Sequence, residues 1–113
     1  MIRVDLYLNQ QGEIQSFEVK GHAGYAPKGE DIVCAAVSAL TFGTVNAITE
    51  LLAVPLAVEM EEEGGFLHCT VPSGLAQDVQ EKVQLLLQGM HLSLRSIEQE
   101  YGRHLKIVIH GKR

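Results

Sequence analysis

An uncharged stretch of 18 residues, from Ile32 to Thr49, most narrows the folds open to this chain. Apolar residues recur through it at helical spacing, which predicts a helix from about Asp31 to Ala53. A helix without a charged face needs cover on several sides, from its own domain, from a second subunit or from a membrane. Because serine, threonine, asparagine and glycine residues interrupt it, we predict a buried or interfacial helix and no membrane partner.

Five other segments alternate apolar and polar residues, as strands with one buried face do. These segments are 2–8, 13–20, 56–61, 67–71 and 104–110. The second of them shifts phase after Ile14, which predicts a β-bulge. Before the last strand, apolar residues step by three and four from Val79 to Tyr101, which predicts a second helix. The order ββαββαβ predicts an α+β fold in two layers, with a mainly antiparallel sheet and both helices packed on one face.

Composition and charge limit the function more broadly. The length of 113 residues suits a single domain, residues 1–113, that buries its own core. A net charge of −5 disfavours direct contact with nucleic acid and suits a basic partner. Asp5 stands where a signal peptide would have its apolar core, so we expect a cytoplasmic protein. The cysteines and histidines lack the spacing of a structural zinc site, and no phosphate-binding glycine motif is present, so we expect no metal or cofactor.

The candidate chemistry lies between Gly21 and Leu40. The first half of this segment is rich in glycine and carries His22, and Asp31 is expected to be the N-cap of the helix. Cys34 would then be the third helical residue, among unpaired N–H groups at the positive end of the helix dipole, which favours a thiolate. A histidine on the preceding loop can take the thiol proton and give it to a leaving group. The pattern indicates a cysteine nucleophile with a histidine base.

Each of these residues also has a purely structural interpretation. A lone cysteine in an alanine-rich helix is often a small core residue, and a lone histidine is often exposed or caps a helix. A carboxylate at Asp31, one turn from the thiol, opposes thiolate formation. Ser38, one turn after Cys34, can bond its own backbone or contact a substrate. Cys69 points inward on its predicted strand and is expected to be structural.

The segment resembles the signature of the ribosomal-processing cysteine protease family, known as Prp. The resemblance rests on Gly-His-Ala at 21–23 and on Gly-x-Asp-Ile-Val-Cys-Ala-Ala-Val-Ser-Ala-Leu at 29–40, and the length and element order match as well. Members of this family remove a short N-terminal extension from one large-subunit ribosomal protein (L-twenty-seven). The resemblance therefore implies a cysteine protease with a ribosomal protein precursor as its substrate. It also implies a homodimer, which would account for the uncharged helix.

Carried over by motif position, the resemblance implies His22 as the base and Cys34 as the nucleophile. Asp31 and Ser38 fall on the same motif and would have supporting roles. A loop from Ala23 to Glu30 would order over the bound peptide. The loop residues singled out are Gly24, Tyr25 and Gly29.

Two other classes of function are consistent with the residues alone. One is a ribosome-associated binding module without catalysis, in which Cys34 is only a packed thiol. The other is a thiol hydrolase or acyltransferase that acts on small molecules. An inert Cys34 thiol would favour the first, and a cleft too short for an extended peptide would favour the second.

Overall fold

The computed structural model describes the backbone of residues 1–21, 28–61 and 65–111, and the side chains of the same ranges except 28–31. Five strands and two helices follow one another in the predicted order. They are β1 (Ile2–Leu8), β2 (Ile14–Lys20), α1 (Lys28–Leu51), β3 (Ala57–Met60), β4 (Phe66–Thr70), α2 (Gln77–Glu100) and β5 (Leu105–His110).

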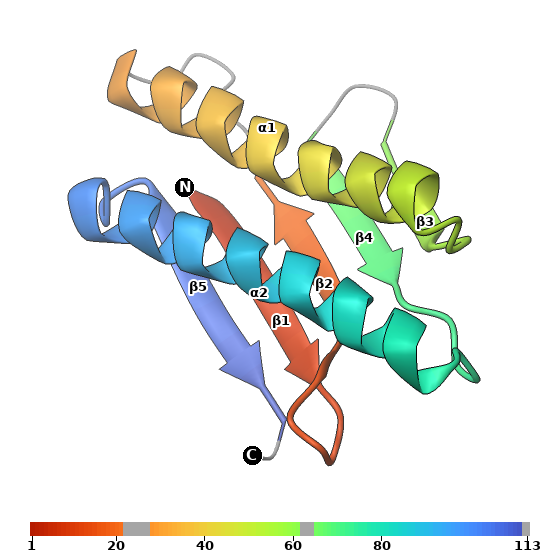
Figure 1. Cartoon of the computed structure of the whole chain (residues 1–113). Coiled ribbons are helices and arrows are strands. Elements are labelled where there is room, and N and C mark those ends of the chain that lie inside the picture. Colours follow the sequence, from red (N-terminus) through yellow and green to blue (C-terminus); the bar gives the residue numbers. More distant parts are fainter. Residues whose placement is uncertain (22–27, 62–64, 112–113) are drawn as a thin grey trace.

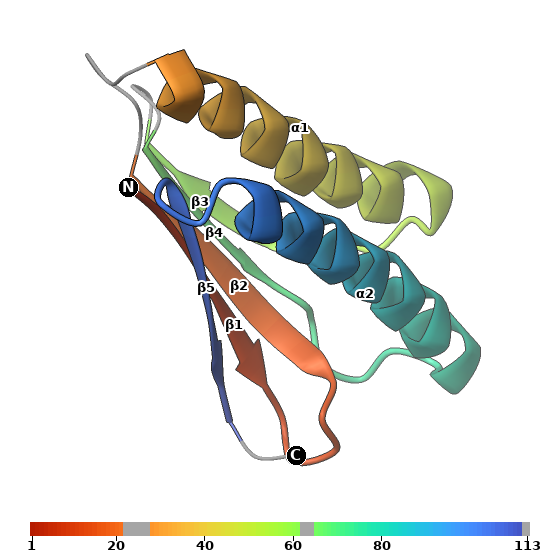
Figure 2. The ribbon, with the colours of Figure 1, turned by 90° about the vertical axis from the view of Figure 1, so that its left-hand side faces the viewer.

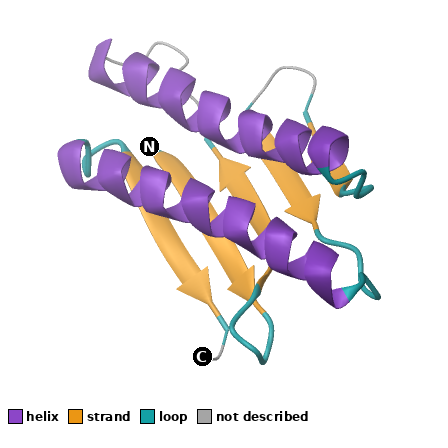
Figure 3. Cartoon of the chain, in the orientation of Figure 1, coloured by secondary structure: helices purple, strands orange, loops and turns teal. Residues whose placement is uncertain are grey.

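The strands form one sheet in the order β3-β4-β2-β1-β5. The pairs β1–β2, β2–β4 and β3–β4 are antiparallel, and β1–β5 is parallel. Both helices lie side by side across the same face, and none of the described residues form a helix on the opposite face (Figures 1 and 2). The colouring by secondary structure makes the two layers plain (Figure 3). The predicted α+β fold with a mainly antiparallel sheet is confirmed.

The predicted bulge lies in β2. Tyr7 pairs with Ser16 and the next residue, Leu8, pairs with Ile14, so Gln15 is the extra residue on the β2 side. The bulge shifts the alternation of the strand by one residue. As a result Ile14 and Phe17, which are three positions apart, both point into the core with 1% of their surface exposed.

The core lies between the sheet and one side of each helix. The residues of α1 that are buried there are Val33, Val37, Thr41, Val45 and Ile48. From α2, the buried residues are Val83, Leu87, Met90 and Leu94. Two residues that helical spacing places in the apolar stripes lie differently: in α2, Leu87 is fully buried and its neighbour Leu86 only partly, and Leu51 is 77% exposed because α1 ends there.

The segment Ile32–Leu51 of α1 is long and apolar enough to cross a membrane, with a mean hydropathy of 1.7. A helix that packs on the core of a soluble domain meets the same criterion. Here one side of α1 packs on the core, and its Thr41 and Thr44 hydroxyls donate to the carbonyls of Val37 and Leu40, at 2.9 and 2.7 Å. A single helix of this kind is weak grounds for a membrane protein.

A carboxylate, Asp5, is buried on the face of the sheet away from the helices, with 2% of its surface exposed. Arg3 donates to both of its oxygens: Nη2 to Oδ1 at 3.1 Å, and Nε to Oδ2 and Oδ1 at 3.1 and 3.2 Å. His110 Nε2 lies 2.7 Å from Oδ1, and its ring stacks on Tyr7. Burial acts to raise the pKa of Asp5, but the hydrogen bonds from Arg3 and His110 together outweigh it, so the pKa lies below its ordinary value.

We expect Asp5→Asn to lower the free energy of unfolding at pH 7 by about 2 kcal/mol, because it weakens charge-assisted hydrogen bonds to a buried carboxylate. The pKa of Asp5 is lower in the folded state than in the unfolded chain. The stabilisation from the Asp5 carboxylate is therefore present above about pH 4 and is lost as the pH falls through the folded-state pKa of Asp5. Urea unfolding between pH 2 and 7 measures it. Glu59→Gln, an exposed carboxylate on the same face, is the control and should change stability by less than about 0.5 kcal/mol. Equal effects of the two changes would contradict the assignment.

Candidate active site

Cys34 lies on α1, but deeper in the helix than the sequence suggests. The helix begins at Lys28, so Asp31 is not its N-cap and Cys34 is its seventh residue rather than its third. Gly29 is also helical, although it was expected in a loop. The sequence offers a reason: between residues 28 and 31 only Gly29 disfavours a helix, by about 1 kcal/mol, and acidic residues are favourable in a first turn.

The earlier start of α1 changes the electrostatics expected at the thiol. Only the first four N–H groups of a helix lack partners within it, and the influence of the dipole fades within the first turn. The N–H of Cys34 therefore belongs to the paired part of the helix. The dipole contributes less to a thiolate than expected, and the backbone N–H of Cys34 is not available as an oxyanion-hole donor.

The side chain of Cys34 is half-buried and packs against the core, next to the fully buried Val33 and one turn before Val37. These two valines fix the rotation of α1, and with it the direction in which Cys34 and Ser38 point. Ser38 is one turn further along the same side and is exposed. The distance between the two positions along the helix axis is about 6 Å.

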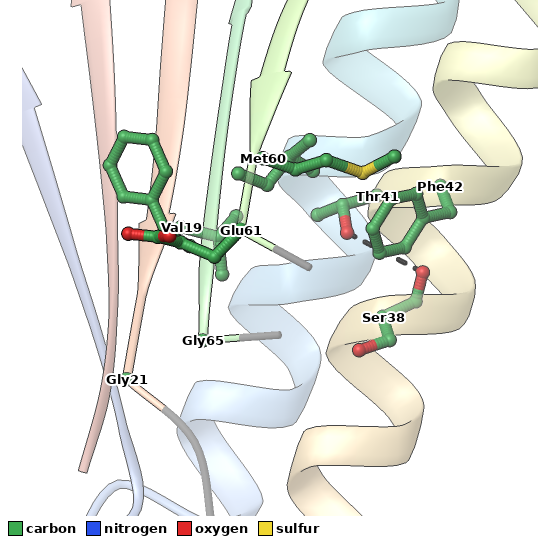
Figure 4. A pocket seen from close by; sticks show the side chains of 10 residues that line it. Val19, Gly21, Ser38, Thr41, Phe42, Met60, Glu61 and Gly65 are labelled. Carbon is green, nitrogen blue, oxygen red and sulfur yellow. Dashed lines mark hydrogen bonds between the residues drawn. The ribbon is translucent and has the colours of Figure 1, made fainter. Parts of the chain in front are cut away.

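A cavity of about 100 Å³ opens beside this part of α1 (Figure 4). Ser38, Thr41 and Phe42 of α1 form one wall, and Met60 and Glu61 at the end of β3 lie across from it. The remaining lining comes from the adjoining ends of β2 and β4, including Gly21 and Gly65. The cavity thus joins the helix that carries Cys34 to the residue that precedes His22 in the chain.

The walls of this cavity are mainly apolar. Phe42 and Met60 are exposed to 38% and 61%, so their apolar surface is open to solvent at the cavity. Thr41 is buried, and its hydroxyl is already used by the carbonyl of Val37. Ser38 and Glu61 are the lining residues whose side chains can offer polar contacts at the rim. The cavity therefore suits an apolar side chain flanked by polar backbone.

The sequence anticipated some of these positions and missed others. His22, Gly24 and Tyr25 lie outside the residues that the structure describes, as does the side chain of Asp31. Phe42 and Met60 were missed: Phe42 is one apolar residue among many, and the alternation of residues 56–61 places Met60 on the apolar side of its strand. No local sequence signal marks them, because the exposure of Met60 follows from the position of β3 at the edge of the sheet, where side chains are less covered.

The two cysteines differ in environment, and neither forms a disulfide. Cys69 on β4 is 1% exposed, and burial raises the pKa of its thiol to about 11. A thiol of that kind is protonated and unreactive near neutral pH, which agrees with a structural role. Within the described ranges, no group of three or more His, Cys, Asp or Glu side chains is placed to hold a metal ion.

Comparison with known proteins identifies the family. The family model described as "Cysteine protease Prp" matches residues 1–106. The chain belongs to the cysteine protease Prp family. It is therefore a peptide hydrolase. Family membership thus favours the protease interpretation over the two alternatives that the residues alone left open, a binding module without catalysis and a hydrolase of small molecules.

Relatives named as Prp cover almost the whole chain. The ribosomal processing cysteine protease Prp of Bacillus subtilis is 37% identical over 107 residues, which is 95% of this chain and 96% of the relative. Its Staphylococcus aureus counterpart is 36% identical over the same length. The crystal structure of S. aureus Prp with a substrate peptide matches with a TM-score of 0.86 at 34% identity, over 97% of this chain and all of that one. The same enzyme with a covalently linked product peptide matches with a TM-score of 0.84.

If the cavity beside α1 receives a side chain of a substrate peptide, Met60→Ala should lower kcat/KM for that peptide about tenfold, mostly through a higher KM. The reason is a loss of roughly 1 to 1.5 kcal/mol of apolar contact with the bound peptide. Initial-rate kinetics on a ribosomal-protein peptide measure it. Val58→Ala is the matched control, because Val58 is also half-exposed on β3 but does not line the cavity. A loss of the same size in both variants, or in neither, would rule out this use of the cavity.

Proposed function

We propose that this protein is a cysteine endopeptidase that removes a short N-terminal extension from a large-subunit ribosomal protein (L-twenty-seven). The observation that carries the proposal is the position of Cys34 in a chain of the Prp family: it is half-buried on α1, one turn from Ser38 at the rim of a mainly apolar cavity. The relatives' names describe ribosomal processing. One relative with a closely similar fold has a crystal structure in complex with a substrate peptide. A net charge of −5 suits a basic ribosomal protein as the substrate.

The proposed mechanism is acyl transfer through Cys34 and His22. The thiol proton passes to the His22 imidazole, and the thiolate attacks the carbonyl carbon of the scissile bond. His22 then gives that proton to the leaving amine as the carbon–nitrogen bond breaks, which leaves a thioester on Cys34. Water attacks the thioester with His22 as the base, the new carboxylic acid departs, and the thiol is restored.

Supporting roles are proposed for two further residues of the motif. The hydroxyl of Ser38 is exposed at the rim of the cavity, where it can donate to the backbone of the bound peptide. Asp31 precedes Cys34 by three residues, so it lies on the same side of α1 by helical spacing and can orient the imidazole of His22. The segment with Gly24 and Tyr25 is proposed to cover the peptide, and Gly29 lies at the helical start that follows it.

The decisive experiment is cleavage of a peptide that spans the extension and the first residues of the mature ribosomal protein. Mass spectrometry should find a single cut by the wild-type protein and none by Cys34→Ala or His22→Ala. Cys69→Ala is the control: it loses a buried structural thiol and should keep its cleavage activity at a temperature where it is folded.

Iodoacetamide labelling separates the remaining outcomes. The wild-type protein should be labelled once at pH 7, at Cys34, because Cys69 is buried with a raised pKa. Cleavage by Cys34→Ala would rule out the nucleophile assignment. No cleavage by the wild type, with rapid labelling of Cys34, would point to a different peptide or a small-molecule substrate instead.

We also propose that the protein is a cytoplasmic homodimer, and that the outer side of α1 lies in the interface. Only 28% of the apolar Ile32–Leu51 segment is buried within one chain, and Ile32 is 56% exposed. The residues that point outward next to it, Ala35, Ala39 and Gly43, are small and uncharged. A second copy of this helix can approach such a surface closely, and no charge opposes its burial.

Ala39→Arg places a charge in the middle of this surface and should shift the protein to monomers by at least tenfold in dissociation constant, since burying an unpaired charge is costly. Sedimentation equilibrium measures the shift. Gln88→Arg, at an exposed position on α2, adds the same charge elsewhere and should leave the dimer intact. A wild-type protein that sediments as a monomer would contradict the proposal.

A further inference from the structure

A second cavity, of about 250 Å³, lies between α2 and the sheet, and it shares no lining residue with the cavity beside α1. The strands contribute only apolar side chains to its lining, which are Leu6, Leu8, Ile14 and Ile109. The helix contributes only polar ones, which are Gln88, His91 and Arg95. We call this site the α2 cavity. An apolar lining with a few convergent polar groups is the usual composition of a site for a small molecule.

The ring of His91 carries a polar atom without a partner. Its Nε2 is buried and forms no hydrogen bond with any described residue, which is rare for a buried polar atom in a folded protein. Burial lowers the pKa of His91, and the charge of Arg95 lowers it further against an opposing effect of Glu98. The ring is therefore neutral at pH 7. In one tautomer its Nε2 can donate a hydrogen bond to a molecule in the cavity.

Arg95 is the only charged residue among those that line the α2 cavity. It follows His91 by four residues, so the two side chains lie on the same side of α2. Within the described ranges Arg95 forms no ion pair with a carboxylate. A guanidinium binds a carboxylate through two parallel hydrogen bonds, and this geometry favours arginine wherever a carboxylate is recognised. The polar wall thus presents a cation and a hydrogen-bond donor next to each other.

We propose that the α2 cavity binds a small carboxylate with an apolar tail. The carboxylate pairs with Arg95 and accepts a hydrogen bond from Nε2 of His91, and the tail packs on the apolar side chains of the strands. The cavity is smaller than the roughly 300 to 1,000 Å³ of sites for drug-sized ligands, so the occupant has on the order of ten non-hydrogen atoms. An apolar floor does not suit a fully hydrated anion such as inorganic phosphate, because it offers no hydrogen bonds in place of water.

This carboxylate chemistry occurs in a free short-chain acid and at the C-terminus of a peptide that ends in an apolar residue. The inference does not depend on the proposed protease activity, since the α2 cavity and the cavity beside α1 are lined by different residues. Binding can therefore be measured on the whole protein without a cleavage assay.

Hexanoate is the first probe, titrated into the full-length ¹⁵N-labelled protein at pH 7 while NMR follows the imidazole signals. We expect saturable shifts of the His91 ring and a dissociation constant below about 1 mM, a modest affinity for a ligand of about eight non-hydrogen atoms. 1-Hexanol keeps the tail without the charge, and acetate keeps the charge without the tail. Each should bind at least about tenfold more weakly than hexanoate.

Bound hexanoate should also raise the pKa of His91, because a carboxylate beside the ring stabilises its charged form. The charged groups that act on the ring in the free protein are Arg95 and Glu98, both on α2. The side chains that line the cavity opposite it, from β1, β2 and β5, are apolar. A probe that bound elsewhere on the surface would leave this pKa unchanged.

Arg95→Gln should weaken hexanoate binding at least about tenfold through loss of the charged pair. Arg103→Gln is the matched control, because it removes an exposed cation that does not line the α2 cavity, and it should leave the dissociation constant within about twofold. His91→Leu removes the unpartnered nitrogen. It should unfold at the same or a higher temperature than the wild type and bind hexanoate about tenfold more weakly.

Three results would each overturn the proposal: no saturation by hexanoate at about 20 mM, equal affinities for hexanoate and 1-hexanol, or wild-type affinity in Arg95→Gln. N-acetyl-leucine separates the two sources of the carboxylate. Tighter binding than hexanoate assigns the α2 cavity to a peptide C-terminus and weaker binding to a free acid, and both results support a carboxylate site. Failure of the proposed protease activity would leave these binding results unchanged, so the two proposals are tested separately.

Discussion

The packing of α1 on the sheet is the constraint on which the rest of the structure depends. Val33, Val37, Val45 and Ile48 are buried along one side of the helix, and that stripe permits only one rotation about the helix axis. The rotation leaves Cys34 half-buried at the border of the core, where a thiol is ordered by its neighbours but still reachable. It also turns Phe42 toward the end of β3, which forms the cavity.

The fold followed from the sequence because its periodic patterns are long and agree with one another. The alternation in β1, the phase slip at Ile14 and the stepping of apolar residues in α2 each predict an element that the structure contains. Single positions were harder to predict. Asp5 alternates with buried apolar residues as an exposed residue would, but Arg3 and His110, which is distant in the sequence, cover it on the open face of the sheet. A contact between β1 and β5 cannot be read from either strand alone.

The candidate site was predicted unevenly for a similar reason. The motif led to Cys34 and to Ser38 at the cavity rim, since both are local features of one helix. The start of that helix was wrong by four residues, because Asp31 has a good capping side chain but residues 28 to 30 are also compatible with a helix. The cavity walls at Phe42 and Met60 depend on the sheet order, in which β3 is an edge strand beside α1. That order is a property of the whole chain.

The corrected start of α1 bears on how the thiol becomes reactive. A cysteine in the first turn would owe much of its thiolate character to unpaired N–H groups, but Cys34 lies beyond them. Its side chain is half-buried against the core, which orders the thiol. The start of the helix is therefore a weaker source of thiolate character than the motif suggests. In the proposed mechanism His22 takes the thiol proton, and the imidazolium so formed stabilises the thiolate. In that mechanism the reactivity of Cys34 depends on one imidazole as well as on the helix that holds the thiol.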